Sequence, residues 1–173
     1  MSKTKENLEA AFAGESMARN KYTYFANVAR KEGYHYIAKI FEETAFNEMR
    51  HAKDHFILLE GIKDTIGNLQ EAIEGEDYET SSMYPDFAKE ADAEGETAAA
   101  NLFRQIAKVE AKHRDRYKKL LEMVKDGTVW KREKSIKWKC DVCGYIHEGT
   151  EPPEKCPCCK HGREHYEPAN LEF

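Results

Sequence analysis

The sequence contains Glu48-Met49-Arg50-His51 and, 62 residues later, Glu110-Ala111-Lys112-His113. Both segments have the pattern Glu-x-x-His, and this i, i+3 spacing places the carboxylate and the imidazole on one face of a helix. In a sequence this rich in glutamate a single copy can arise by chance, and its histidine is then an ordinary surface or core residue. Two copies at matching positions indicate instead a metal site built on paired helices.

The repeat extends along most of the chain up to Val124. Breaks in the helical periodicity at glycines predict four helices over residues 4–32, 35–60, 69–94 and 96–125. Asn68 and Glu71 offer a capping box for the third helix, and Pro85 should kink it. Very short turns join the first helix to the second and the third to the fourth, which predicts two antiparallel hairpins. The same shift of 62 also relates Tyr22 to Tyr84, Phe25 to Phe87, Gly33 to Gly95 and Phe41 to Phe103.

Carboxylates also match along the helix axes. Glu15 lies 18 residues before Gly33 and Glu48 lies 15 after it, so at about 1.5 Å per residue the two are nearly level in the hairpin. Glu79 and Glu110 are placed in the same way around the second turn. A glutamate opposite a Glu-x-x-His pair, in each of two hairpins, is the ligand plan of a di-iron carboxylate bundle.

The residue types suit this chemistry. Hard oxygen ligands with a few imidazoles favour iron, and several carboxylates offset the charge of two cations in a dry core. Without metal these carboxylates would repel one another and take up protons, so we expect the metal-free bundle to be less stable. Tyr22 lies two helical turns beyond Glu15 on the same face, and Tyr22 and Tyr84 either hydrogen-bond the ligands or are ordinary core residues.

All five cysteines lie between residues 140 and 159. Two C-x-x-C pairs separated by twelve residues predict a tetrahedral four-thiolate metal site, and a structural zinc ribbon has the same ligands. Cys158 is the spare thiol. The predicted ligands are Cys140, Cys143, Cys156 and Cys159.

The composition excludes several classes of protein. A formal net charge of −5 argues against nucleic acid as the main partner, and the apolar runs are too short to span a bilayer. The N-terminus lacks the apolar stretch of a secretory signal, which predicts a cytoplasmic protein whose clustered cysteines bind metal. We expect a large helical domain over residues 1–137, including a linker, and a small metal-binding domain over 138–173.

At five segments the chain resembles the rubrerythrin family: Ala13-Gly14-Glu15-Ser16, Gly75-Glu76-Asp77-Tyr78-Glu79, Met83-Tyr84-Pro85 and the two Glu-x-x-His pairs. The resemblance implies a mainly α fold, with a ferritin-like four-helix bundle followed by a rubredoxin-like domain. It also implies that Glu48 and Glu110 bridge two irons, and that one iron moves between Glu79 and His51 as its oxidation state changes. The implied bundle ligands are Glu15, Glu48, Glu76, Glu79, Glu110 and His113, with His51 as an alternative ligand.

By the same resemblance the four cysteines hold one iron, and the protein is a non-haem di-iron peroxidase that reduces hydrogen peroxide to water in protection against oxidative stress. The electrons would come from a rubredoxin or an NAD(P)H-dependent reductase, and would pass between subunits of a head-to-tail homodimer or larger homo-oligomer. Two alternatives remain open. One is a ferroxidase that stores iron, and the other is a stress-response binding protein with structural zinc in the tail.

Overall fold

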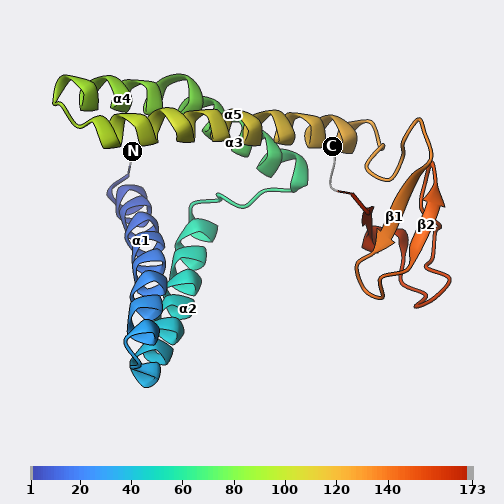
Figure 1. Ribbon diagram of the computed structural model, residues 1–173, viewed down its shortest axis with the longest axis horizontal. Helices are drawn as coiled ribbons and strands as arrows, with labels where there is room; N and C mark the ends of the chain where they lie inside the picture. The colour runs from blue at the N-terminus through green and yellow to red at the C-terminus, as the bar shows by residue number, and fades with distance from the viewer. Residues whose placement is uncertain (1, 171–173) are drawn as a thin grey trace. The chain divides into compact units, whose positions relative to one another are not determined.

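The computed structural model describes residues 2–170, so residues 1 and 171–173 of the two expected domains lie outside the described residues. The chain is mainly α, with a small sheet near its C-terminus, as predicted (Figure 1). It divides between Lys63 and Asp64 into two compact units. Within residues 2–170 no helix combines the length and the apolar character needed to cross a membrane. The helices are α1 (Lys3–Lys31), α2 (His35–Leu58), α3 (Thr65–Tyr78), α4 (Tyr84–Ala93) and α5 (Thr97–Lys125), with a π-helical segment η1 (Glu79–Met83) between α3 and α4.

The first hairpin consists of α1 and α2, which run antiparallel side by side (Figure 1). The hydroxyl of Ser2 accepts a hydrogen bond from the backbone N–H of Lys5 and caps the start of α1. The turn depends on Gly33, whose φ of 86° is a left-handed conformation that glycine adopts without strain. Both helices were predicted to within two residues of their observed ends.

In the second hairpin α3, η1 and α4 form one continuous rod that packs along α5. The predicted start of the third helix, at residue 69 after Asn68, is wrong. The carboxylate of Asp64, and not Asn68, is the cap, because it accepts a 2.7 Å hydrogen bond from the backbone N–H of Gly67. The helix therefore begins at Thr65, and the connection between the hairpins is only Leu59–Asp64, shorter than the sequence suggested.

The irregularity expected at Pro85 takes the form of the π-helical turn η1 immediately before it. Pro85 itself lies in the first turn of α4, where the missing backbone N–H costs least. A π turn accommodates one residue more than the same length of α-helix. The side chains of α3 are therefore rotated about the helix axis relative to those of α4. This rotation decides which acidic residue of α3 faces α5.

The two hairpins repeat each other in detail near their turns. Three aromatic rings cluster in each, Tyr22, Phe25 and Phe41 in the first and their repeat partners in the second, with ring centroids 5.6–6.4 Å apart. An ion pair also joins the helices at equivalent positions, with its charges exchanged. The pairs are Arg30 with Glu42 and Arg104 with Asp92.

Burial within the helices is restricted to small side chains. Among residues 2–170, every helical residue that is buried is an alanine, such as Ala26 and Ala38 in the first hairpin and Ala88 and Ala100 in the second. Alanine allows two helices to approach closely but contributes little apolar area. The large apolar side chains of the hairpins are half-buried or exposed.

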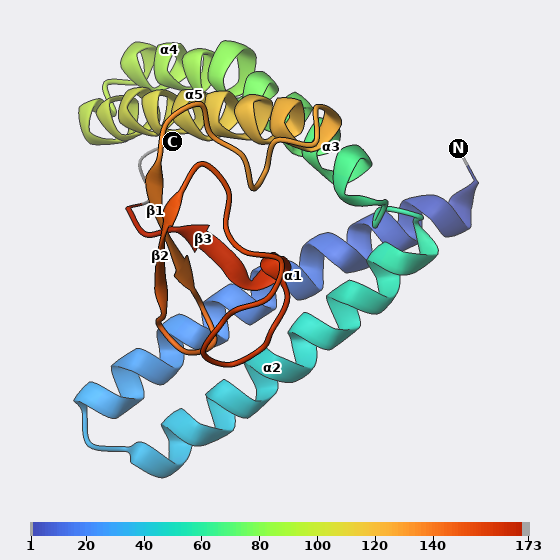
Figure 2. The same ribbon diagram turned by 90° about the vertical axis from the view of Figure 1, so that its right-hand side faces the viewer.

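The C-terminal domain is a three-stranded antiparallel sheet with the strand order β2-β1-β3 (Figure 2). Trp138 on the central strand is fully buried against Cys140, Cys156 and Tyr166. Its indole N–H donates a 3.0 Å hydrogen bond to the carbonyl oxygen of Gly149. The elements are β1 (Ile136–Cys140), β2 (Ile146–Gly149), the 3-10 turn η2 (Arg163–His165) and β3 (Tyr166–Pro168).

Candidate metal centres

The first hairpin brings together Glu15 from α1 and the pair Glu48 and His51 from α2. Ligand atoms of all three side chains lie within 4.8 Å of one another. The Nδ1 atom of His51 is 2.8 Å from Oε2 of Glu48 and 3.9 Å from Oε1 of Glu15. The sequence spacing placed Glu15 and Glu48 at the same level of the hairpin, and in the structure their carboxylates are close together.

The second hairpin holds an equivalent cluster of Glu76 from α3 and the pair Glu110 and His113 from α5. The Nδ1 atom of His113 is 2.6 Å from Oε2 of Glu110 and 3.6 Å from Oε1 of Glu76. Each hairpin thus presents two carboxylates and one imidazole at a single point, which is half of the ligand set expected for a di-iron bundle.

The cluster contains Glu76, and not the neighbouring Asp77 that the gap-free repeat pairs with Glu15. Asp77 instead accepts a 3.0 Å hydrogen bond from Nη1 of Arg114. Tyr22 follows Glu15 by seven positions, whereas Tyr84 follows Glu76 by eight. The π turn η1 accommodates this extra residue. Glu76 and Tyr84 therefore lie at positions equivalent to those of Glu15 and Tyr22 in the first hairpin.

Glu79 is the first residue of the π turn and lies outside the cluster of three. It is nevertheless close enough to raise the pKa of Glu76 and of Tyr84. Burial is the main reason for the raised pKa of Tyr84, and the charges of Glu79, Glu110 and Glu76 add to it. Tyr84 therefore lies beside the acidic cluster, as the sequence suggested, and Tyr22 occupies the equivalent place in the first aromatic cluster.

The electrostatics of both clusters favour a bound cation. The hydrogen bond and the like charge of Glu48, together with burial, raise the pKa of Glu15, and burial followed by the charge of Glu110 raises that of Glu76. Carboxylates that are pushed toward protonation by one another form strong ligands for a multivalent metal, because the metal removes the repulsion. The donor set of carboxylate oxygens and imidazole nitrogens fits iron.

His55, which was not among the predicted ligands, also lies near the first cluster. His55 is half-buried and close enough to Glu15 to lower the pKa of that carboxyl. Its position, four residues after His51 and seven after Glu48, was the available signal, because these offsets lie on one helical face.

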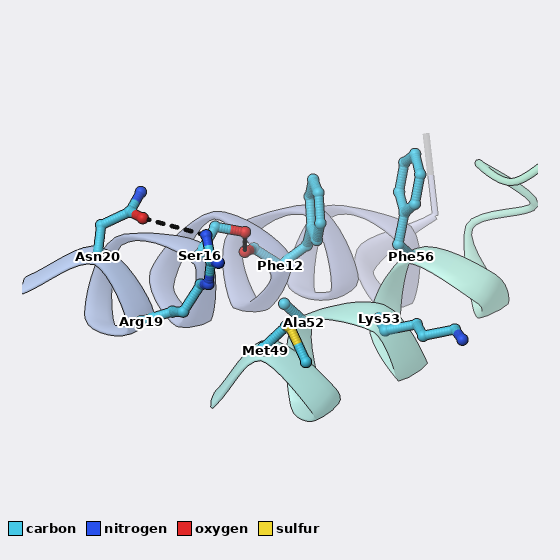
Figure 3. A pocket seen from close by; sticks show the side chains of 8 residues that line it. All are labelled: Phe12, Ser16, Arg19, Asn20, Met49, Ala52, Lys53 and Phe56. Atoms are coloured by element: carbon cyan, nitrogen blue, oxygen red, sulfur yellow. Dashed lines mark hydrogen bonds between the residues drawn. The ribbon is translucent and has the colours of Figure 1, made fainter. Parts of the chain in front are cut away.

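An open groove of about 390 Å³ lies on the α1–α2 hairpin (Figure 3). Phe12 and Phe56 stack at one end of it with ring centroids 4.7 Å apart. Figure 3 shows Arg19 from α1 and Lys53 from α2 among its lining residues, so the groove carries cationic side chains. The remaining lining residues are Ser16, Asn20, Met49 and Ala52.

Four cysteines of the C-terminal domain form the third cluster. The Sγ atoms of Cys140 and Cys159 are 3.7 Å apart, as are those of Cys143 and Cys156, and all four lie within 4.8 Å of one another. A tetrahedral metal with metal–sulfur bonds of about 2.3 Å requires sulfur–sulfur distances of roughly 3.8 Å. The observed cluster meets this requirement, and the exposed Cys158 is not part of it.

Within this cluster, the surroundings of Cys156 stabilise its thiolate. Burial alone would raise the pKa of Cys156, but backbone N–H groups of Cys159 and Cys158 and the hydroxyl of Tyr166 lower it to about 6. His161 also approaches the cluster, with its Nδ1 atom 3.3 Å from the sulfur of Cys159. A thiolate that forms near neutral pH is ready to bind metal.

Comparison with known proteins agrees with this set of sites. The rubrerythrin family model matches residues 6–121, and the model of the rubrerythrin rubredoxin-like domain matches residues 138–167. The chain is 45% identical over 185 aligned positions to rubrerythrin of Porphyromonas gingivalis, covering 99% of this chain and 92% of that protein. It is 44% identical to rubrerythrin of Nitratidesulfovibrio vulgaris, covering 96% of this chain and 94% of that protein.

Among solved structures, nigerythrin in a mixed-valence state is 34% identical, covers 97% of this chain and 87% of its own, and has a TM-score of 0.36. The sequence matches, and not this superposition, show the relationship. With the carboxylate and histidine groups of each hairpin and the four-cysteine cluster, these matches confirm the predicted cofactors, a di-iron site and a rubredoxin-like iron site.

Proposed function

Because this chain belongs to the rubrerythrin family, we propose that it is a peroxidase that reduces hydrogen peroxide to water with electrons relayed through the four-cysteine iron site. The observation that carries the proposal is that one chain holds both acidic clusters and a four-thiolate cluster of tetrahedral dimensions. A protein that only stored iron would have no use for a one-electron donor. Free cysteines grouped in this way also suit a reducing cytoplasm, where we propose that the protein protects against oxidative stress.

We assign the metal ligands by cluster. The two irons would be bound by Glu15, Glu48, Glu76, Glu110 and His113. Of these, Glu48 and Glu110 would be the bridging carboxylates. Glu79 and His51 would be alternative ligands at one of the irons, since Glu79 adjoins the second cluster and His51 belongs to the first. Bound iron supplies the two electrons that, with two protons, convert one hydrogen peroxide into two water molecules.

The chain's own residues would control protons at this centre. Without iron, Glu15 and Glu76 bind protons more readily than ordinary glutamates, and bound iron would displace those protons from their carboxylate oxygens. Tyr84 has a raised pKa and stays protonated at neutral pH, so its hydroxyl can donate a hydrogen bond to a neighbouring carboxylate. We propose the same role for Tyr22.

Electron delivery would use the cysteine domain. A rubredoxin or an NAD(P)H-dependent reductase would reduce its iron, one electron at a time, and the electrons would pass to the acidic centre. We propose that this transfer occurs between subunits of a head-to-tail homodimer or larger homo-oligomer.

Stopped-flow spectroscopy tests the function directly. The fully reduced protein should be oxidised by hydrogen peroxide faster than by oxygen, whereas a ferroxidase should react with oxygen and ferrous iron without needing the cysteine domain. The absorption spectrum of the oxidised protein shows which metal the four-cysteine site binds, because a ferric four-thiolate site is red and a zinc site is colourless. A colourless, fully metal-loaded protein would overturn the peroxidase proposal.

A further inference from the structure

Two of the four clustered sulfurs lie in the core of the C-terminal domain. Cys140 and Cys156 are fully buried, whereas Cys143 is exposed. The two buried cysteines share this core with Trp138 and Tyr166. A buried sulfur is shielded from water, so the protein groups around it determine how well its negative charge is stabilised.

The sheet places Tyr166 beside the cysteine cluster. Tyr166 is the first residue of β3, and it is the antiparallel partner of Cys140 on β1. Side chains of directly opposite residues lie on the same face of a sheet, so the phenol ring and the sulfur of Cys140 share one face. Because Tyr166 is only 4% exposed, its side chain belongs to the interior of the domain.

The hydroxyl of Tyr166 is a proton donor without an ordinary acceptor. Its oxygen is buried, and no group among the described residues forms a hydrogen bond of normal geometry with it. The other aromatic donor of this core, the indole N–H of Trp138, is already paired with the carbonyl oxygen of Gly149. Leaving a buried hydroxyl without an acceptor is costly, so this group calls for a partner.

The sulfur of Cys156 is the acceptor within reach. The backbone N–H of Cys159, the hydroxyl of Tyr166 and the backbone N–H of Cys158 together overcome the effect of burial and lower the pKa of Cys156. Conversely, burial and then the interaction with Cys156 raise the pKa of Tyr166. The phenol therefore stays protonated at neutral pH, so the hydroxyl donates and the sulfur accepts.

We propose that the hydroxyl of Tyr166 donates a hydrogen bond to the iron-bound sulfur of Cys156 and thereby raises the reduction potential of the four-cysteine iron. The reduced site carries one more negative charge than the oxidised site, and the sulfurs share this charge. A donor directed at a sulfur stabilises the ferrous form more than the ferric form. One electron enters the iron, no proton is transferred, and the four iron–sulfur bonds remain. This inference depends on iron in the cysteine site and not on the reaction with peroxide.

Tyr166→Phe tests the hydrogen bond, because it removes the hydroxyl and keeps the ring. We expect the equilibrium constant for reduction of the iron to fall about tenfold, which for a one-electron couple lowers the potential by about 59 mV. A redox titration of the full-length protein, followed by the red absorbance of the ferric site, measures the potential. Tyr145→Phe is the matched control, since Tyr145 lies two residues after the ligand Cys143 but is 37% exposed. The control should keep the wild-type potential.

An unchanged potential in iron-loaded Tyr166→Phe would overturn the proposal, and Tyr166 would then have only a packing role. An equal fall in Tyr145→Phe would also overturn it, because the effect would not depend on the buried hydroxyl. A protein with the expected shift but without peroxide turnover would leave this inference intact and contradict the proposed function.

A second measurement uses the wild-type chain and does not depend on a variant that binds iron. The protein is loaded with an NMR-active cadmium isotope, which four thiolates also bind. The hydroxyl proton of Tyr166 should exchange slowly with water and show scalar coupling to the metal through the sulfur of Cys156. A hydroxyl proton that exchanges rapidly and shows no coupling would rule out the hydrogen bond.

Discussion

Glu76 takes in the second hairpin the place that Glu15 takes in the first. The Oε1 atom of Glu76 is 3.6 Å from Nδ1 of His113, and the Oε1 atom of Glu15 is 3.9 Å from Nδ1 of His51. The two glutamates are 61 residues apart, although the rest of the repeat has a shift of 62. The π turn η1 compensates for this difference of one residue.

Deleting Ser82 from the π turn should therefore disrupt the second cluster. Without the extra residue the turn becomes α-helical, and α3 rotates by about 100° relative to α4. Glu76 then points away from Glu110 and His113. We expect bundle iron to fall at least by half, measured by metal analysis, while the red absorbance of the cysteine site is unchanged.

Ser82→Ala is the matched control, because it keeps the chain length and should keep the iron. A deletion variant with full bundle iron would show that the π turn does not set the position of Glu76.

The sequence was sufficient for the features that depend on regular helices. The Glu-x-x-His pairs, the turns at Gly33 and Gly95 and the level of Glu15 against Glu48 all follow from the helical repeat, and the structure has them. The grouping of the four cysteines follows from spacing alone, and the structure has it. These predictions succeed because helix periodicity and metal-ligand spacing are local properties of the chain.

Helix periodicity does not decide between neighbouring residues. Asp64 and Asn68 are both good helix caps, and only the observed hydrogen bond to Gly67 selects Asp64. The gap-free repeat alone pairs Glu15 with Asp77, and the family resemblance was needed to select Glu76, because a π turn has no simple sequence signature. The pairing of Asp77 with Arg114, two residues far apart in sequence, settles the choice only in three dimensions.

Glu79→Ala should slow peroxide turnover several-fold or more. Glu79 lies close enough to the second cluster to raise the pKa of Glu76 and Tyr84, and we propose that it is an alternative iron ligand. Single-turnover oxidation by peroxide, followed by absorbance, measures the effect.

Asp77→Ala is the control for charge removal in the same helix, since Asp77 pairs with Arg114 and not with the cluster. The control should retain turnover, and both variants should keep the red colour of the tail. Equal turnover in wild type and Glu79→Ala would remove Glu79 from the proposed ligands.

Cys158→Ser should leave the iron site of the C-terminal domain unchanged. Cys158 is exposed and lies outside the group of four sulfurs, whereas Cys156 is fully buried within it. Cys156→Ser removes a thiolate ligand and should abolish the red absorbance. Visible spectra of the two variants, purified side by side, compare them directly. Loss of colour in Cys158→Ser would mean that the fifth cysteine also binds the metal.

The stability of the metal-free protein should fall as pH rises from about 4.5. Glu15 and Glu76 have pKa values raised above 4.5 in the folded chain, mainly by the hydrogen bond with Glu48 and by burial respectively. Above pH 4.5 the unfolded carboxyls have lost protons that the folded ones still bind, so each further increase in pH favours unfolding. The loss is complete once both folded carboxyls are ionised.

Thermal unfolding of the helices, followed by circular dichroism from pH 4 to 8, measures this effect. Glu15→Gln with Glu76→Gln removes both titrating groups, so the decline in Tm with pH should be smaller in the double variant than in the wild type. Iron should raise Tm at neutral pH in the wild type, because it binds the ionised carboxylates only in the folded state. If wild type and double variant lose stability in parallel across this range, repulsion within the clusters does not limit the metal-free fold.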